Sequence, residues 1–298
     1  MDGILVINKP EGMTSFDVIA RLRKKYGQKK FGHAGTLDPM ASGVLVILAG
    51  SATKLLPFLK DTDKEYIAEL ELGTSYDTDD VFGKAEATAP VNTDFDFAAV
   101  LHEFEGKQHQ LVPKASAKKV NGKKLYEYLR AGQPVPEVYS DVEIYSIEPL
   151  EAAGDCPYRF KIACSSGTYI RSICRDFGTK TGNLAAMKSL IRTKANGFTI
   201  EDAQPLDAEM HTLYPAERLL GYERLEAFDT DSLPPQKDQT DRTPKPYVCY
   251  DDIRNGRKVR IDAKGDQVLI VYKDQPLAIY SRIEEGKPAF ASKRGLWS

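Results

Sequence analysis

Residues 44–49, with the sequence Val-Leu-Val-Ile-Leu-Ala, form the longest wholly apolar run of the chain, and a glycine-rich loop precedes them. An apolar run this short, bounded by turn-forming residues, predicts a buried strand rather than a helix. Other elements must cover such a strand, so the fold needs a sizeable core. The chain of 298 residues is long enough for that core, and we expect two domains.

The other apolar patterns predict strands and helices in irregular alternation. We expect Ser15 to cap the first helix and Gly27 to end it, while residues 31–43 form a loop. Strands are expected at 4–7, 43–49, 65–73, 142–147 and 158–164, and helices at 15–26, 52–60, 95–104, 124–130 and, after a glycine turn, 165–178. This order does not suit a doubly wound fold, and it predicts an α+β domain with a mixed sheet.

The end of the chain has a different composition. Residues 228–247 are rich in Pro, Asp, Thr and Lys and predict a linker or an extended crossing. Short strands at 267–272 and 277–281, separated by turn signals, then predict a small all-β module. We therefore expect a first domain at 1–240 and a C-terminal β-module at 247–298.

Composition narrows the classes of protein. No apolar stretch approaches the roughly 18 residues of a membrane helix, and the N-terminus has no basic head or long apolar run of a signal peptide. The four cysteines show no CxxC spacing, which favours free thiols in a reducing cytoplasm. GxxxxGK[ST], GxGxxG and HExxH motifs are absent, and the four histidines lack metal-ligand spacing. We therefore expect neither a metal nor a cofactor.

The net charge is only −2, but the basic residues are unevenly distributed. The segment 21-RLRKKYGQKK-30 has six basic residues and no acid, and 114-KASAKKVNGKK-124 has five and no acid. These two basic clusters are either solvated surface or a phosphate-binding face. The sequence alone favours the first interpretation, because only convergence in space makes a patch.

Three further features are candidates for chemistry. Asp38, in 32-GHAGTLDPMASGVL-45, either caps a turn or acts on a ligand that the surrounding glycines admit. Tyr66 lies on the apolar face of its expected strand, as an ordinary core aromatic would. In 164-CSSGTYIRS-172, Tyr169 and Arg171 diverge on a helix but share a side on extended backbone. An arginine beside Asp38 would keep that carboxylate ionised and oriented.

Taken together, these segments resemble the bacterial tRNA pseudouridine-55 synthases of the TruB type, over nearly the whole chain. The matching motifs, in family order, are 8-NKPEGMTS-15, 32-GHAGTLDPMASGVL-45, 64-KEYIAELELG-73, 116-SAKKVNGKKLYEYLRAG-132, 164-CSSGTYIRSICRDFG-178 and 190-LIRTKANGF-198. Six motifs in register make coincidence a poor explanation. The resemblance implies a largely antiparallel pseudouridine-synthase sheet, a C-terminal PUA-like RNA-binding module, and a monomer.

The resemblance also implies roles for individual residues. Asp38 corresponds to the nucleophile, Arg171 to its partner, and Tyr66 to the tyrosine that stacks on the target base and is a plausible general base. Tyr169 and Leu190 correspond to walls of the uracil pocket. His33 corresponds to the histidine that fills the space left by the flipped-out nucleotide.

The implied substrate is uridine 55 in the T loop of tRNA, with the C-terminal module on the acceptor stem. The resemblance turns the basic clusters into an expected RNA-phosphate face comprising Arg21, Arg23, Lys24, Lys29, Lys30, Lys118, Lys119 and Lys123. Ala115 departs from the family, where many relatives carry Tyr, which puts one RNA contact in doubt.

Two other functions stay open at this point. One is an RNA-binding or tRNA-folding chaperone that does not depend on Asp38. The other is a glycosidase or nucleosidase, which also attacks an anomeric carbon but normally needs a second carboxylate. Asp77, Asp79 and Asp80 are the obvious candidates, although nothing in the sequence ties them to Asp38, and the role of Asp77 is open.

Overall fold

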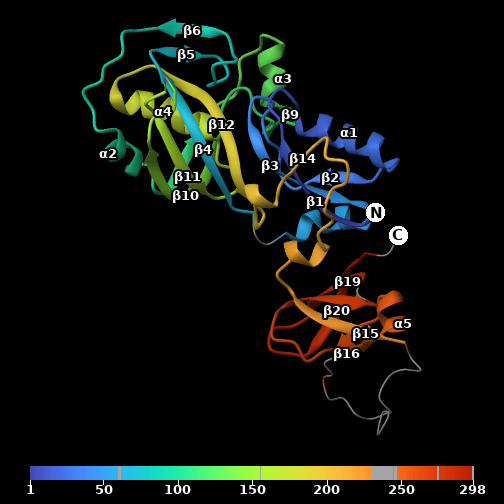
Figure 1. The fold of residues 1–298 in the computed structure, drawn as a ribbon. Helices are drawn as coiled ribbons and strands as arrows, with labels where there is room; N and C mark the ends of the chain where they lie inside the picture. The colour runs from blue at the N-terminus through green and yellow to red at the C-terminus, as the bar shows by residue number, and fades with distance from the viewer. Residues whose placement is uncertain (60–61, 155, 230–243, 245–246, 274, 297–298) are drawn as a thin grey trace.

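Two β-sheets dominate the protein (Figure 1). The computed structural model describes residues 1–59, 62–154, 156–229, 244, 247–273 and 275–296. A large ten-stranded sheet with a few helices forms the first part of the chain, and a six-stranded sheet forms the end. This arrangement confirms the expected α+β class with a C-terminal β-module.

The ten-stranded sheet is mostly antiparallel. Its strands are β1 (Gly3–Lys9), β2 (Phe31–His33), β3 (Ser42–Ala49), β4 (Lys64–Leu72), β7 (Gly106–Leu111), β10 (Tyr139–Leu150), β11 (Arg159–Cys164), β12 (Ala185–Ala195), β13 (Phe198–Thr199) and β14 (Gln204–Pro205). The order is β14-β1-β3-β12-β4-β11-β10-β7, with β2 on β3 and β13 on β12. Only the pairs β1–β14 and β3–β12 are parallel. Two separate hairpins pair β5 (Thr74–Tyr76) with β6 (Ala85–Thr88) and β8 (Lys119–Val120) with β9 (Lys123–Lys124).

The central strand β12 is absent from the elements predicted by sequence patterns. It pairs with β4 along most of its length and with β3 at one end. Its register with β4 shifts between Met187 and Ser189 and again between Arg192 and Lys194. Each irregularity breaks the alternation of inward and outward side chains, so the two-residue period that marks a strand is lost.

The helices are short. The α-helices are α1 (Ser15–Tyr26), α2 (Phe97–His102), α3 (Leu125–Arg130), α4 (Ile170–Thr181) and α5 (Tyr250–Arg254), and the 3-10 helices are η1 (Gly50–Phe58), η2 (Ile200–Asp202) and η3 (Ala216–Leu219). The helix expected at 52–60 is therefore a 3-10 helix, and Pro57 lies inside it.

Some predicted boundaries were wrong. Thr14, not Ser15, caps α1, because its hydroxyl accepts from the Asp17 amide while the Asp17 carboxylate accepts from the Thr14 amide. Residues 31–33 of the expected loop form β2. Helix α4 continues through Gly178, where an added Cβ would lie 2.6 Å from the Cβ of Ala185. This glycine allows α4 to pack against β12 rather than ending the helix.

The apolar run at 44–49 is buried on both faces. Leu45, Ile47 and Ala49 join a core with the apolar sides of α1, α2 and α4. Val44, Val46 and Leu48 face the opposite way, into a second core. Alternation along β3 thus supplies two cores from one strand, which is why residues 44–49 are all apolar.

The second core joins the two parts of the protein. It combines residues of β1 and β3 with Leu269, Val271, Ile279 and Leu296 of the C-terminal sheet. The two sheets therefore share buried side chains and are not separated by a solvated linker.

The C-terminal sheet begins before the expected boundary. Its strands are β15 (Glu223–Phe228), β16 (Tyr247–Cys249), β17 (Val259–Arg260), β18 (Gln267–Tyr272), β19 (Gln275–Arg282) and β20 (Ala289–Gly295), in the order β16-β15-β18-β19-β20-β17. Strand β15 lies within the residues expected for the first domain. Most of the expected linker, at residues 230–243 and 245–246, lies outside the described residues.

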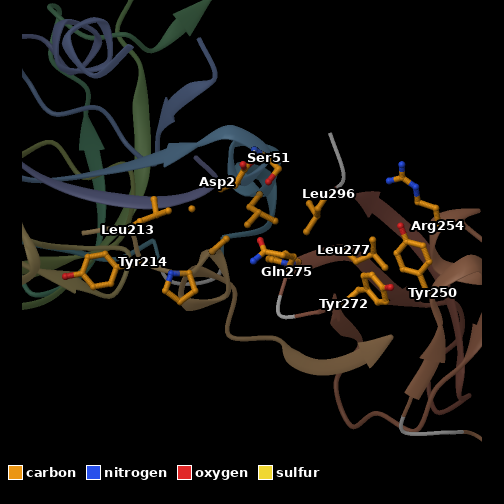
Figure 2. Close-up of a pocket in the computed structure, with 16 residues that line it drawn as sticks. Asp2, Ser51, Leu213, Tyr214, Tyr250, Arg254, Tyr272, Gln275, Leu277 and Leu296 are labelled. Atoms are coloured by element: carbon orange, nitrogen blue, oxygen red, sulfur yellow. Dashed lines mark hydrogen bonds between the residues drawn. The ribbon is translucent and has the colours of Figure 1, made fainter. Parts of the chain in front are cut away.

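A cavity of about 420 Å³ lies where the two sheets approach each other (Figure 2). Asp2 and Ser51 of the first part face Gln275, Leu277 and Leu296 of the second. Within the described ranges, no helix is both long and apolar enough to cross a membrane.

Candidate active site

A larger cavity, of about 860 Å³, opens beside the central strands of the ten-stranded sheet. Five of the predicted site residues line it, namely Asp38, Tyr66, Tyr169, Arg171 and Leu190. They come from the loop between β2 and β3, from β4, from the start of α4 and from β12. The fold therefore brings together side chains that are far apart in the sequence.

Asp38 forms an ion pair with Arg171 in this cavity. Nη2 of Arg171 lies 3.1 Å from Oδ2 of Asp38. The aspartate side chain is 36% exposed, whereas the arginine side chain is only 6% exposed. A carboxylate that is open to a ligand thus rests on a buried cation, which fixes its direction.

The start of α4 explains how Tyr169 and Arg171 reach the same cavity. Tyr169 precedes the helix as its N-cap residue and has extended backbone, with φ −102° and ψ 111°. Arg171 lies in the first turn of the helix. The sequence left open whether these side chains diverge or converge, and the change of backbone conformation between them makes them converge.

Arg171 is held by more than Asp38. Its Nη1 donates to the Thr78 carbonyl at 2.8 Å, and its Nη2 donates to the Ala115 carbonyl at 3.1 Å. Nη1 also lies 3.6 Å from Oδ2 of Asp80. These contacts fix the guanidinium before any substrate arrives, which is the preorganisation that electrostatic catalysis needs.

Asp80 corrects the interpretation that nothing ties the acidic turn at 77–80 to Asp38, because both carboxylates contact the Arg171 guanidinium. Oδ1 of Asp80 accepts from the Thr78 hydroxyl and from the Phe82 amide. Burial raises the pKa of Asp80, while Arg171 opposes that shift. Asp80 is buried and does not line the cavity, so it supports the arginine rather than flanking a substrate bond as a second acid would.

Asp77 does line the cavity, but its carboxylate is used by its own turn. Its Oδ1 accepts from the Lys84 amide at 2.8 Å. This contact is a structural function for the acid whose role the sequence left open.

The N-terminal motif at 8–15 holds the loop that carries Asp38. The fully buried Lys9 donates from Nζ to the Pro39 carbonyl and to two carbonyls of its own turn. The Ser15 hydroxyl accepts from the Leu37 amide and donates to the Leu37 carbonyl. Residues immediately before and after Asp38 are therefore anchored by segments near the N-terminus.

Tyr66 is buried on β4 at the wall of the cavity. Burial raises the pKa of its hydroxyl to about 12, although the nearby Arg192 guanidinium lowers it. The phenol is therefore protonated at neutral pH in the free protein. Burial also raises the pKa of Tyr169.

His33 lies on β2, next to the loop, and is not part of the cavity lining. Burial and the Arg192 charge lower its pKa, so the imidazole is neutral at pH 7, and its Nδ1 accepts from the Gly35 amide. The sequence placed His33 with the site, and the structure places it at the start of the loop that forms the site.

The predicted RNA-phosphate residues lie on two segments. Arg21, Lys24, Lys29, Lys30, Lys118 and Lys119 are exposed. Arg23 is half-buried, donates to the Phe31 carbonyl and lies over the Phe16 ring, so it also serves the packing of α1. Lys123 lies over the Tyr128 ring, with 4.3 Å between its Nζ and the ring centroid.

Sequence reasoning missed several buried polar residues around the site. Arg192, Lys9 and Gln110 lie within motifs or strands but carry no pattern of their own. Among the described residues, no group of His, Cys, Asp and Glu side chains is arranged to hold a metal ion.

Comparison with known proteins identifies the family. The sequence profile described as the N-terminal domain of TruB family pseudouridylate synthases matches residues 23–170. The chain is 37% identical over 294 residues to tRNA pseudouridine synthase B of Bacillus subtilis, covering 93% of this chain and 94% of that protein. It is 38% identical over 296 residues to the protein of the same name from Oceanobacillus iheyensis, covering 94% and 92% of the two chains.

Solved structures agree on the fold. A chain in the crystal structure of a Cbf5–Nop10–Gar1 complex superposes with a TM-score of 0.66 at 23% identity, over 99% of this chain and 85% of that one. A similarity at this level of identity supports the architecture only. The sequence matches, over nearly the full length of each relative, place the chain itself in the TruB family of pseudouridylate synthases.

Proposed function

We propose that this protein isomerises uridine 55 in the T loop of tRNA to pseudouridine, with Asp38 as the nucleophile on a flipped-out nucleotide. The observation that carries the proposal is the ion pair between Asp38 and Arg171 at the wall of a cavity large enough for a nucleotide. The named substrate of the relatives, tRNA, supplies the substrate class.

The reaction breaks the N1–C1′ bond of uridine and forms a bond between C5 and C1′. It needs an anionic group beside the ribose and a site that retains the freed uracil. Asp38 supplies the anion and is oriented by its ion pair with Arg171. Tyr66, Tyr169 and Leu190 line the same cavity and would stack on the base and enclose it.

The target nucleotide must leave its stack before Asp38 can reach it, which costs a few kcal/mol. We infer that His33 fills the space left behind. A neutral, half-buried imidazole on the rim of the Asp38 loop suits a stacking role better than a charged one would.

We infer that the two basic clusters contact RNA phosphates, as a sequence-independent complement to the cavity. Burial, and then the neighbouring charges of Lys30 and Arg294, lower the pKa of Lys54, so Arg294 of the C-terminal module lies near the first cluster. This continuity supports an RNA path from the first cluster to the C-terminal module, where we place the acceptor stem. One chain supplies all of the predicted residues that line the cavity, and we propose that a monomer is active.

The test is to map pseudouridine in tRNA after incubation with the wild-type protein and with Asp38→Asn. We expect the wild type to modify position 55 and the variant to be inactive while it still binds tRNA. Modification at the wild-type rate by the variant would contradict the mechanism. A tRNA-folding activity that survives in the variant would instead indicate an additional chaperone role independent of Asp38.

The acceptor-stem assignment needs a separate test. Truncation at 247 would expose the core shared by the two sheets, so charge reversal of the exposed Lys293 and Arg294 is the better perturbation. The double variant should bind full-length tRNA more weakly while binding an isolated T-arm hairpin as before. Equal losses on both RNAs would refute the assignment.

A further inference from the structure

Arg192 is a fully buried cation in the middle of the catalytic domain, with 1% of its surface exposed. Within the described ranges, no carboxylate forms an ion pair with it. Burial of a charge without an opposite charge costs several kcal/mol unless its hydrogen bonds are met. The contacts of Arg192 show which groups this buried charge binds.

The guanidinium of Arg192 binds both ends of the loop that carries Asp38. Its Nη1 donates to the Thr36 carbonyl at 3.1 Å, and its Nη2 donates to the Gly35 carbonyl at 3.3 Å. On the far side of the loop, its Nε donates to the Val44 carbonyl at 2.7 Å. One side chain therefore fixes the backbone before and after the nucleophile.

Strand β12 also places Arg192 directly beside Tyr66. The two residues are opposite each other in the β4–β12 register, and opposite residues extend to the same face. On its other side, Arg192 is opposite Gly43 of β3. A Cβ on Gly43 would lie 2.2 Å from the Arg192 carbonyl oxygen, so only glycine allows this approach.

The charge of Arg192 acts on the hydroxyl that it faces. Burial raises the pKa of Tyr66, and the largest opposing influence is the charge of the Arg192 guanidinium. Other charges near the phenol do not replace it, because Asp38 and Cys164 act in the opposite direction.

We propose that Arg192 is a positioning residue for pseudouridine formation, which ties the Asp38 loop to Tyr66 and stabilises negative charge on the Tyr66 oxygen. This inference rests on the proposed function. Closing the C5–C1′ bond leaves a hydrogen on C5 and none on N1, so one proton must leave C5 and one must reach N1. When the Tyr66 hydroxyl gives its proton to N1 and then takes the C5 proton, its oxygen is negative between the two transfers. Arg192 lies where that charge develops.

The experiment compares Arg192→Lys, which keeps the charge, with Arg192→Gln, which removes it, each with and without Tyr66→Phe. Single-turnover pseudouridine formation is measured on saturating tRNA, and thermal unfolding monitors the fold. Lys194→Gln, an exposed substitution on the same strand, is the matched control.

We expect Arg192→Gln to react at least about tenfold more slowly than Arg192→Lys, since tenfold corresponds to one pKa unit of lost stabilisation. That difference should disappear in the Tyr66→Phe background. A purely structural role for Arg192 predicts the same difference in both backgrounds, and that result would overturn the proposal.

A second measurement remains available where the Tyr66→Phe protein is too slow to assay. The ionisation of Tyr66 can be followed by tyrosinate absorbance in the protein without RNA. Arg192→Gln should raise the pKa of Tyr66, and Arg192→Lys should leave it closer to the wild-type value. An unchanged titration in Arg192→Gln would refute the electrostatic role even where the protein forms pseudouridine. Absence of product from the wild-type protein would instead count against the proposed function alone.

Discussion

The backbone of Tyr169 is held through both atoms of a single side-chain amide. Gln110, buried on the edge strand β7, accepts from the Tyr169 amide at 2.8 Å and donates to the Tyr169 carbonyl at 3.1 Å. Because Tyr169 is the N-cap of α4, its amide lacks a partner within that helix. The Gln110 side chain thus makes the two hydrogen bonds to the Tyr169 backbone that a neighbouring strand would otherwise make.

The substitution Gln110→Glu changes one atom of this pair. An ionised glutamate still accepts from the Tyr169 amide, but its second oxygen then faces the Tyr169 carbonyl with no proton between them. The Tyr169 carbonyl still accepts from the Ser172 and Ile173 amides. The loss is one hydrogen bond of about 1 kcal/mol, plus roughly 1–3 kcal/mol because the new carboxylate oxygen is buried without a donor. The ionised variant should therefore be about 2–4 kcal/mol less stable than the wild type.

Protonation reverses this loss. A protonated carboxyl group donates as the amide did, so the folded state favours that form and raises the carboxyl pKa above its ordinary value of about 4.3. At 1.36 kcal/mol for each pKa unit, a penalty of 2–4 kcal/mol corresponds to a rise of roughly 1.5–3 units. A raised pKa contributes stability that is present at low pH and is lost as the pH rises through the folded-state value. The variant should accordingly approach wild-type stability near pH 5 and fall below it near pH 8.

The assay is the thermal unfolding midpoint of wild type and variant between pH 5 and pH 8, with single-turnover pseudouridine formation over the same range. Gln108→Glu is the control, because Gln108 lies on the same strand but is half-exposed and does not contact Tyr169. We expect the wild-type and control proteins to show no matching recovery at low pH. A deficit in Gln110→Glu that is independent of pH, or that equals the deficit of the control, would refute the reasoning.

Two other expectations follow from the contacts of the site. Asp80→Asn should keep the acceptor for Thr78 and Phe82 but turn a neutral amide toward Arg171. We therefore expect single-turnover rates to fall about 10- to 100-fold while tRNA binding is retained. The control Asp77→Asn, in the same turn but without an Arg171 contact, should lose much less activity, and equal losses would contradict a role through Arg171. Burial raises the pKa of Tyr66 to about 12, so the tyrosinate absorbance of wild type and Tyr66→Phe should not differ below about pH 10. A phenolate signal near pH 8 would instead show that this hydroxyl is ionised before the reaction.

The ion pair of Asp38 and Arg171 could be predicted from the sequence because its residues are unusual for their surroundings. Asp38 interrupts a run of small residues before a buried strand, and Arg171 follows a glycine turn. The residues around Asp38 also allowed it to cap a turn, and a helix would have directed Arg171 away from Tyr169. The order of the motifs along the chain favoured the functional interpretation. The structure adds the reason for their convergence, which is the change from extended to helical backbone after Tyr169.

The strand β12 could not be predicted because its pattern is broken by two register shifts. At the first shift, Met187 pairs with the turn at 79–81, and the second shift follows the residues that pair with β3. These partners lie far away in the sequence. The C-terminal boundary was displaced for a similar reason. Strand β15 is parallel to both of its neighbours, so its partners lie far along the chain and give no hairpin signal near residue 223.

The polar residues that sequence reasoning missed have one property in common, since Lys9, Gln110 and Arg192 all donate to backbone carbonyls. Every residue has a carbonyl, so no residue type in the sequence marks the acceptor. A carboxylate partner would have left a complementary charge to search for, as Asp38 did for Arg171. The cations that bind the Asp38 loop can therefore be identified only from the path of the backbone in three dimensions. Their charge is not cancelled by that backbone, which leaves a positive field where the reaction places negative charge on its oxygens.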